Sequence, residues 1–253
     1  EVYGGAIYST WLDRPLSIAG RIALKNPQSA HPRLKLVDFK RPVAVLPNLA
    51  IHLNRAMNDG VALNAQTDLL PICGMNEHMD TDTFLQILAN ETGEKPEDIL
   101  CFDLSVYHYA EPVRTGFSGD MFMAPRIDNI SSVQACLTGL IEANPSDGIS
   151  VAVLFDHEEI GSRSKNGANG NLLSYTLERI CNALNISIEI FLQILVHSYY
   201  LSLDVAHAIH PAHPEKSDIT SAMPLNRGFA IKASAKHAYC SDDDMTGVIL
   251  QLA

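Results

Sequence analysis

The first part of the chain, up to about residue 72, consists of short apolar runs broken by turn residues. Three such runs, at residues 6–8, 18–24 and 43–46, are separated or followed by Asn-Pro, His-Pro and Pro-Asn pairs. Short apolar runs bounded by proline and asparagine are typical of an antiparallel or barrel-like β region. Residues 81–90 differ, because their apolar side chains fall on one helical face and predict a short helix.

Longer apolar periodicities follow residue 100. Residues 149–155 (ISVAVLF) are almost wholly apolar and rich in β-branched side chains, as expected of a strand covered on both faces in a parallel sheet. Residues 129–143 and 172–184 repeat apolar side chains at helical spacing. Strands that alternate with helices favour an α/β domain, and the polar stretch at 91–97 is a plausible boundary between it and the β-rich part.

Composition narrows the class of protein and the kind of partner. Hydrophobic residues make up 47% of the 253 residues and charged residues 19%, which is ordinary for a globular protein and unlike a disordered one. The formal net charge is −11. Such an acidic balance repels nucleic acid and anionic membranes at long range, so we expect neither as a partner.

The setting is predicted to be cytoplasmic. The five cysteines are scattered and form no CxxC pair, which indicates neither a structural zinc site nor a dithiol redox centre and fits a reducing compartment. The longest apolar tract, at 186–203, contains Glu189, Gln193 and His197 and is a poor membrane span. No signal peptide is expected from the first residues. Both ends look cut, because the chain opens without Met in a strand-like pattern and stops in a helix-like one.

Polar residues that directly follow strands are the candidates for chemistry, because ligands of open parallel sheets bind beyond the carboxyl ends of the strands. After the strand predicted at 149–155 comes Asp156-His157-Glu158-Glu159. Adjacent carboxylates point in different directions, so one can bind a metal ion while its neighbour reaches a bound water; the alternative is an exposed acidic turn. The zincin motif HExxH is excluded, because Gly161 stands where its second histidine must be.

Two further carboxylates occupy comparable positions. Asp128 directly precedes the helix predicted at 129–143, although Asp128 or Asn129 could instead cap that helix. Asp204 emerges from an apolar run. Histidines follow it at intervals of three, but prolines break any helix that would align them, so Asp204 is a better ligand candidate than His207, His210 and His213.

Together these positions offer hard oxygen ligands with a few imidazoles nearby, which suits Zn, Mn or Co in a bridged pair. Two such ions, about 3.5–4 Å apart, can share a carboxylate and a hydroxide and bring the pKa of the water to about 7. The residues by themselves predict metal-assisted hydrolysis without naming a substrate.

Nine short segments, in order through almost the whole chain, carry a resemblance to a known family. They include APRIDN at 124–129, DHEEIGS at 156–162 and DVAHAIHP at 204–211. The others lie at 3–5, 11–16, 49–55, 102–104, 118–120 and 228–232. The ordered set resembles the M18 family of metallo-aminopeptidases, whose members include aspartyl aminopeptidase.

The resemblance implies an α/β fold with a parallel or mixed sheet. A dinuclear-metal exopeptidase catalytic domain at 101–253 would carry an inserted β-rich oligomerisation domain at 1–100, which helps to build a large homo-oligomer, a tetrahedral dodecamer. The implied activity is removal of the N-terminal residue of peptides, expected to be Asp or Glu, through a metal-bridged hydroxide. Two divalent ions per subunit are expected, zinc first, with Co or Mn as alternatives.

The resemblance also implies roles for single residues. Asp128 resembles the carboxylate that bridges both metal ions, Glu159 a ligand of one ion, and Asp204 a ligand of the other. Glu158 resembles the general base that takes a proton from the bridging water and passes it to the leaving amine. Three residues are expected at the substrate: His52, inserted by a neighbouring subunit, His207, and Lys232, which could pair with an acidic substrate group.

Two metal-binding histidines of the family would lie outside this sequence, one before residue 1 and one after residue 253. We therefore expect this polypeptide alone to be weakly active or inactive. Two other functions stay open. One is a catalytically inactive assembly subunit of the same fold, and the other is a different two-metal amidohydrolase, such as a deacetylase of amino-acid conjugates.

Overall fold

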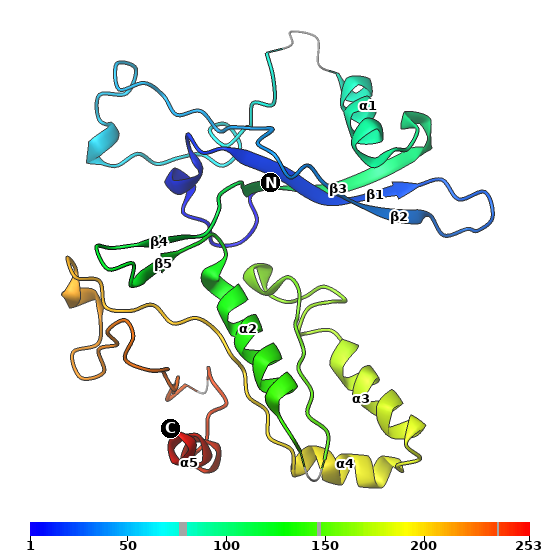
Figure 1. Cartoon of the computed structure of the whole chain (residues 1–253), viewed down its shortest axis with the longest axis vertical. Helices are drawn as coiled ribbons and strands as arrows, with labels where there is room; N and C mark the ends of the chain where they lie inside the picture. The colour runs from blue at the N-terminus through cyan, green and yellow to red at the C-terminus, as the bar shows by residue number, and fades with distance from the viewer. Residues whose placement is uncertain (76–79, 146–147, 237) are drawn as a thin grey trace. The chain divides into compact units, whose positions relative to one another are not determined.

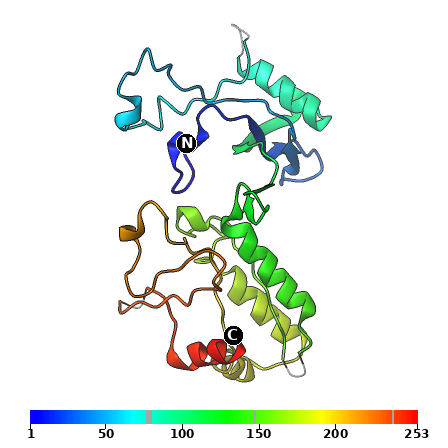
Figure 2. The same ribbon diagram turned by 60° about the vertical axis from the view of Figure 1, so that its left-hand side comes forward.

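The computed structural model describes residues 1–75, 80–145, 148–236 and 238–253. The chain divides into two compact units, Glu1–Pro125 and Arg126–Ala253 (Figure 1 and Figure 2). The first unit holds the strands and both hydrophobic core clusters, whereas the second consists of helices joined by irregular segments.

The first unit is built on a three-stranded antiparallel sheet in the order β2-β1-β3 (Figure 1). The central strand places Ile22 opposite Lys35 on one side and Phe102 on the other, and residues paired in this way share a face of the sheet. The β region predicted from the short apolar runs is confirmed in antiparallel form. The strands are β1 at Leu16–Leu24, β2 at Arg33–Asp38 and β3 at Ile99–His108.

The central strand passes very close to β3 at Gly20, where an added Cβ atom would lie 2.1 Å from the carbonyl oxygen of Asp103. We expect Gly20→Ala to push β1 away from β3 and to lower the free energy of unfolding by about 1–3 kcal/mol, the usual cost of overpacking. Thermal unfolding measures the effect. Gly5→Ala is the matched control, because a Cβ at Gly5 would meet nothing within 4 Å. Equal melting temperatures for G20A and the wild type would contradict this reading of the strand contact.

One face of the sheet is covered by helix α1, Thr81–Thr92, which confirms the helix predicted at 81–90 and extends it by two residues. The carboxylate of Asp80 caps its first turn by accepting from the backbone N–H of Thr83 at 2.8 Å. Gly93 ends it in the left-handed conformation, with a φ of 70°. Burial of Leu88 and Ala89 against the strands makes the main core of the unit, together with Ile18, Ile22, Leu24, Val37, Phe39 and Ile99.

Ion pairs join the end of α1 to strand β2. The Glu94 carboxylate accepts from Arg33 at 2.8 and 3.0 Å and from Lys35 at 2.8 Å. The hydrogen bonds from these two cations lower the pKa of Glu94 from 4.5 to about 2. A carboxyl group whose pKa is lowered by folding stabilises the folded state at pH values above its ordinary pKa. This contribution to the free energy of unfolding disappears as the pH falls toward the lowered pKa.

Glu94→Gln is therefore expected to lower the melting temperature at pH 7, and the difference from the wild type should shrink between pH 4.5 and pH 2. Thermal unfolding across this pH range measures it. Glu97→Gln serves as the control, since Glu97 is an exposed glutamate of the same region that forms no ion pair with the residues described. A pH-independent difference between E94Q and the wild type would argue against the ion pair.

The remaining part of the first unit is less regular than its sequence predicts. Residues 43–46 form isolated bridges, Leu16 with Ala44 and Val45 with Ile72, instead of a continuous strand. The run at 6–8 leads into a 3-10 helix, Tyr8–Trp11. A second small core of Leu12, Leu16, Ala44 and Leu46 fixes this region, and a two-stranded ladder of β4, Val113–Thr115, and β5, Met121–Met123, closes the unit.

The division between the units lies later than the boundary near residue 100 suggested by the polar stretch at 91–97. Strand β3 begins at Ile99 and pairs with β1 along its whole length, so residues 100–108 belong to the same sheet as residues 16–24. A division near residue 100 would break the hydrogen bonds of this paired strand, so the first unit includes β3 and extends to Pro125.

The second unit contains the helices predicted from apolar periodicity. The helix predicted at 129–143 is α2, Ile127–Glu142, and the one predicted at 172–184 is α3, Leu172–Ala183. Two more helices follow, α4 at Ile188–Val196 and α5 at Asp243–Leu252. Short 3-10 turns lie at Glu158–Ile160 and Pro214–Lys216.

The parallel-sheet strand predicted at 149–155 is not formed in the structure. These residues take no regular conformation, and Ile149, Val151 and Leu154 are about half exposed. A strand exists only where a neighbouring backbone accepts its hydrogen bonds, and the described residues after Met123 include no other strand to do so. Both sheets of the described chain are antiparallel.

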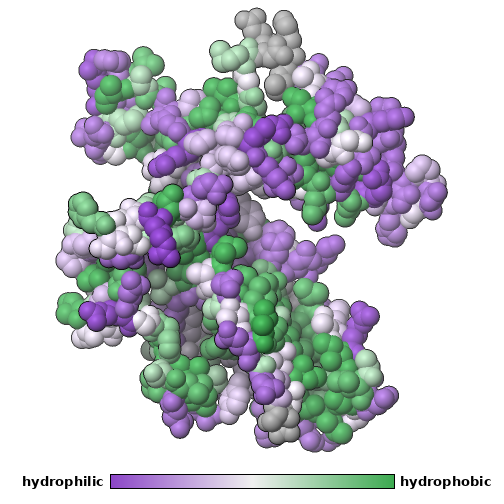
Figure 3. Space-filling view, in the orientation of Figure 1, coloured by the Kyte–Doolittle hydropathy of each residue, from purple (hydrophilic) through white to green (hydrophobic). Residues whose placement is uncertain are grey.

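Large apolar side chains remain exposed over the second unit. Figure 3 shows hydrophobic residues gathered over α2, α3 and α4, where Ile141 and Val196 are both more than 80% exposed. Helix α4 lies within the apolar tract at 186–203 and has nine residues. Among the described residues, no helix combines the length and the apolar character that crossing a membrane requires.

Candidate metal centre

Asp128 lies where the chain enters α2, in a short segment of unusual backbone conformation. Arg126 is left-handed, with a φ of 60°, and Asp128 and Asn129 depart from helical geometry; the peptide bond between these two residues is cis. No backbone N–H of the described residues donates to the Asp128 carboxylate, so this side chain is not the cap of the helix. It is left available for another partner.

Asp128 acts electrostatically on Asp204, whose contacts the structure defines. The Asp204 Oδ1 atom accepts from the backbone N–H of Val205 at 2.8 Å, and its Oδ2 atom accepts from Lys232 Nζ at 3.0 Å. The hydrogen bond from Lys232 lowers the pKa of Asp204, and a side-chain interaction with Asp128 acts in the same direction. The same ion pair raises the pKa of Lys232, with smaller contributions from the charges of Tyr239 and Asp128. Asp128, Asp204 and Lys232 thus form one electrostatic cluster.

Further contacts hold the three segments of this cluster together. The Asn129 side-chain amide donates to the backbone oxygen of Leu203 at 3.4 Å, next to Asp204. The Ser241 hydroxyl donates to the backbone oxygen of Lys232 at 2.8 Å, and Lys232 Nζ lies 5.7 Å from the centre of the Tyr239 ring. Tyr239 and Ser241 were not predicted from sequence, because they lie in an irregular segment without periodicity or motif.

Glu158 and Glu159 lie on a 3-10 turn, Glu158–Ile160, that follows residues 149–155. The turn is flanked by the left-handed residues His157 and Gly161, and His157 Nδ1 lies 2.6 Å from the hydroxyl of Ser164. Both glutamates are exposed, and their carboxylates form no hydrogen bond or ion pair with the residues described. Of the predicted ligands, Asp128 and Asp204 therefore interact electrostatically, and no interaction of either residue with Glu159 is seen among the described residues.

The predicted substrate residues differ in their surroundings. Lys232 belongs to the cluster, whereas His207 is exposed. His52 is exposed in a turn of the first unit. His210 and His213 stack on each other with ring centres 5.1 Å apart, and His210 accepts from the backbone N–H of Ala212, in agreement with a surface role.

Within the described part of the chain, no three or more His, Cys, Asp or Glu side chains are placed to hold a metal ion as a group. Asp128 and Asp204 offer carboxylate oxygen, a group that zinc accepts, and together they carry one more negative charge than Lys232 balances.

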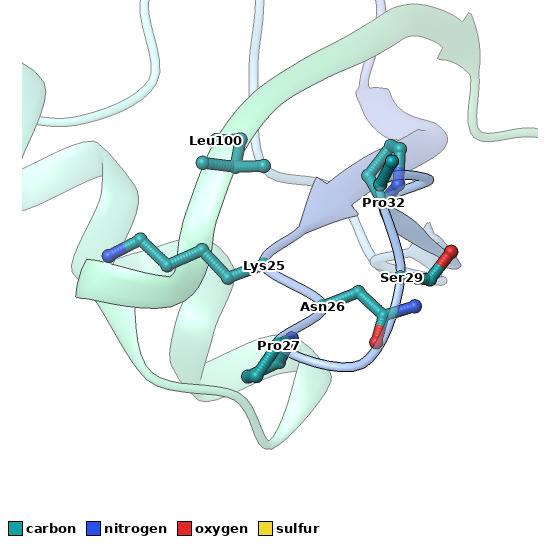
Figure 4. Close-up of a pocket in the computed structure, with 7 residues that line it drawn as sticks. Lys25, Asn26, Pro27, Ser29, Pro32 and Leu100 are labelled. Carbon is teal, nitrogen blue, oxygen red and sulfur yellow. The ribbon is translucent and has the colours of Figure 1, made fainter.

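A shallow pocket at the turn between β1 and β2 is a poor alternative site (Figure 4). Its lining offers no carboxylate, imidazole or thiol, the groups that bind a metal or carry acid–base chemistry. The lining residues are Lys25, Asn26, Pro27, Ser29, Ala30, Pro32 and Leu100. The Asp128–Asp204–Lys232 cluster is therefore the better candidate.

Comparisons with known proteins identify the family of the chain. The family described as aminopeptidase I zinc metalloprotease (M18) matches residues 1–253. The probable M18 family aminopeptidase 2 of Clostridium novyi (strain NT) is 42% identical over 254 residues, which cover 100% of this chain and 59% of that protein. The chain thus spans less than two thirds of the length of this curated relative.

Solved structures show the same fold. A chain in the cryo-EM structure of the Ape4 and Nbr1 complex is similar with a TM-score of 0.85 and 31% identity, over 99% of this chain and 51% of that one. The S. cerevisiae mApe1 dodecamer is similar in fold, with a TM-score of 0.67 and 24% identity, over 88% of this chain and 51% of that one. These similarities support the predicted α/β aminopeptidase fold. The chain belongs to the M18 family of zinc metallo-aminopeptidases.

Proposed function

We propose that this chain supplies part of the active site of a zinc-dependent aminopeptidase, which removes the N-terminal residue of peptides. The observation that carries the proposal is the ion pair of Lys232 with Asp204 at 3.0 Å, together with Asp128, 76 positions before Asp204 along the chain, which acts on the pKa of both groups. Bringing two like charges together is unfavourable unless a cation compensates them. Because the chain belongs to a zinc metalloprotease family, zinc is the ion proposed to compensate the remaining negative charge.

Three carboxylates are proposed as zinc ligands. Asp128 would lie between two ions, Glu159 would bind one of them, and Asp204 the other. Zinc, when bound, polarises the scissile carbonyl group and acidifies a water molecule. Ligands from outside this sequence would complete the site, which is consistent with the weak activity expected of the 253-residue chain alone.

Glu158 is proposed as the general base. It is the neighbour of Glu159 on the same 3-10 turn, so one short segment would provide both a ligand and a proton acceptor. The carboxylate of Glu158 would take the proton of the attacking water and deliver it to the leaving amine. Its exposure, and the absence of an ion pair with the described residues, leave it free for this role.

Substrate recognition is proposed to favour an acidic N-terminal residue. Lys232 is the cation of the cluster, and a substrate carboxylate near it would be attracted, with His207 as a further polar contact. His52 is proposed to reach the site of a neighbouring subunit within a cytoplasmic homo-oligomer. The mApe1 protein, which shares the fold, is a dodecamer.

The proposal is tested with a peptide that has a free N-terminus and with its N-acylated counterpart. Weak hydrolysis of the free peptide, abolished by a chelator and restored by zinc, is the expected result. Hydrolysis of the acylated peptide in preference to the free one would favour the amidohydrolase alternative instead.

A further inference from the structure

We infer that the free edge of strand β2 pairs with β2 of a second copy of this chain. The two strands run antiparallel about a two-fold axis and join two three-stranded sheets into one sheet of six strands. The inference rests on the homo-oligomer of the proposed function and goes beyond it, because it names the strand, its register and the residue at the axis. Metal binding and catalysis have no part in it.

The outer edge of β2 presents backbone groups that have no strand beside them. Among the described residues β2 has a neighbouring strand on one side only, since the order of the sheet is β2-β1-β3 (Figure 1). The N–H of Phe39 donates to the oxygen of Ile18 at 3.0 Å, which fixes the alternation of the antiparallel ladder. The even-numbered residues of β2 therefore direct their N–H and C=O groups away from β1. These residues are Leu34, Leu36 and Asp38.

The same alternation places apolar side chains on the face of the sheet that α1 does not cover. Helix α1 packs on the face that carries Val37, so Leu34 and Leu36 lie on the other face. They are 62% and 82% exposed. Strand β3, at the opposite edge, presents Asp103 on this face, in the same row as Leu36. An exposed apolar edge is a template for pairing with another strand, and β2 is the edge of that kind.

The devices that usually protect an edge strand do not act on this side of β2. Protected edges carry a proline, a bulge or charged side chains. Residues 33–38 contain no proline, and their register with β1 is continuous. The two cations of the strand, Arg33 and Lys35, both lie 2.8 Å from the carboxylate of Glu94, on the face that α1 covers. The leucine face is therefore left without a charge of β2 that would repel a second strand.

Charge and symmetry select the register of the pair. With Leu36 on the two-fold axis, outward backbone groups meet outward backbone groups, and Lys35 lies opposite Val37 of the second copy. A register with Lys35 on the axis would place two like charges directly opposite, which is unfavourable. A register with Val37 on the axis would pair a shorter stretch of β2. The second copy is thus the occupant that the strand fits, with the two Leu36 side chains in contact.

The molar mass of the 253-residue chain in solution, measured by light scattering after size exclusion, tests the interface. We expect Leu36→Lys to lower the molar mass of the assembly at least about twofold, because a lysine at the axis sets two like charges opposite each other. Leu70→Lys is the matched control, since Leu70 is an exposed leucine of the same unit outside the strands. Its assembly should keep the molar mass of the wild type. Thermal unfolding shows whether both variants are folded.

Cysteine cross-linking tests the register without a disruptive charge. Two Leu36→Cys residues across the axis would have their Cα atoms about 5.5 Å apart, within the range that a disulfide spans. Two Leu34→Cys residues would lie about 13 Å apart along the strands, too far for a disulfide. After mild oxidation with diamide, L36C should give at least about fivefold more covalent dimer than L34C. The wild type, with its five cysteines, sets the background.

The inference and the proposed homo-oligomer fail in different ways. If the wild type is oligomeric, but L36K keeps its molar mass and L36C gives no more covalent dimer than L34C, the inference is wrong while the homo-oligomer stands. If the wild type is a monomer at every concentration and L36C gives no covalent dimer above background, both are contradicted.

Discussion

Asp204→Asn is expected to weaken zinc binding at least about 100-fold, because even residues that only orient metal ligands contribute 10- to 100-fold. The amide has one oxygen atom and no charge, so it is a poor substitute for a carboxylate ligand. It also leaves Lys232 without its partner at 3.0 Å. Zinc affinity measured by chelator competition gives the size of the loss, and thermal unfolding shows whether the variant is folded.

Asp218→Asn is the control for this substitution. The Asp218 carboxylate accepts hydrogen bonds from the Thr220 hydroxyl and from the backbone N–H groups of Thr220 and Ser221, which lower its pKa as Lys232 lowers that of Asp204. It belongs to the same unit of the chain and is not a proposed ligand. Similar losses of zinc affinity in D204N and D218N would mean that the effect is structural and that Asp204 is not a ligand.

Glu158→Gln is expected to lower the rate of peptide hydrolysis by about 10²–10⁴-fold, the contribution of a general base, without changing the zinc content. Glutamine keeps the size of the side chain and its oxygen atom but cannot accept a proton at neutral pH. Chelator-sensitive hydrolysis of a fluorogenic peptide at high enzyme concentration, with elemental analysis of the same sample, measures both quantities.

The zinc content and activity of Glu158→Gln are compared with those of Glu159→Gln and Glu178→Gln. Glu159 is the proposed ligand beside the base, so its variant should lose zinc and activity together. Glu178, an exposed residue of α3 without an ion pair to the described residues, should change neither. Loss of zinc in E158Q equal to that in E159Q would show that Glu158 is a ligand and that the proposed roles are wrong.

The helices were predictable from the sequence because their signal is local. Apolar spacing marked α1, α2 and α3 to within a few residues, and the caps at Asp80 and Gly93 set the limits of α1. The prediction of a strand at 149–155 was wrong, because a local pattern does not show whether a pairing strand is present. An apolar β-branched run requires a hydrogen-bonding partner, which can be any other part of the chain.

The residues of the candidate site were named from the sequence, and part of their surroundings was not. Asp128 and Asp204 were identified from their positions and from the family motifs; the structure pairs Asp204 with Lys232, and Asp128 acts on the pKa of both, while the metal-binding roles stay predictions. The contribution of Tyr239 and Ser241 depends on how an irregular segment folds back on Lys232. Such contacts follow from tertiary packing and leave no mark in hydrophobic spacing.

The most direct test of the metal centre is the zinc content of the purified chain, by elemental analysis after zinc addition and extensive dialysis, with Glu159→Ala measured in parallel. Binding of zinc by the wild type, up to two ions per chain, and a lower content in E159A is the result that we expect. Absence of zinc from the wild type after this treatment would contradict the assignment of Asp128, Asp204 and Glu159 as ligands in this chain.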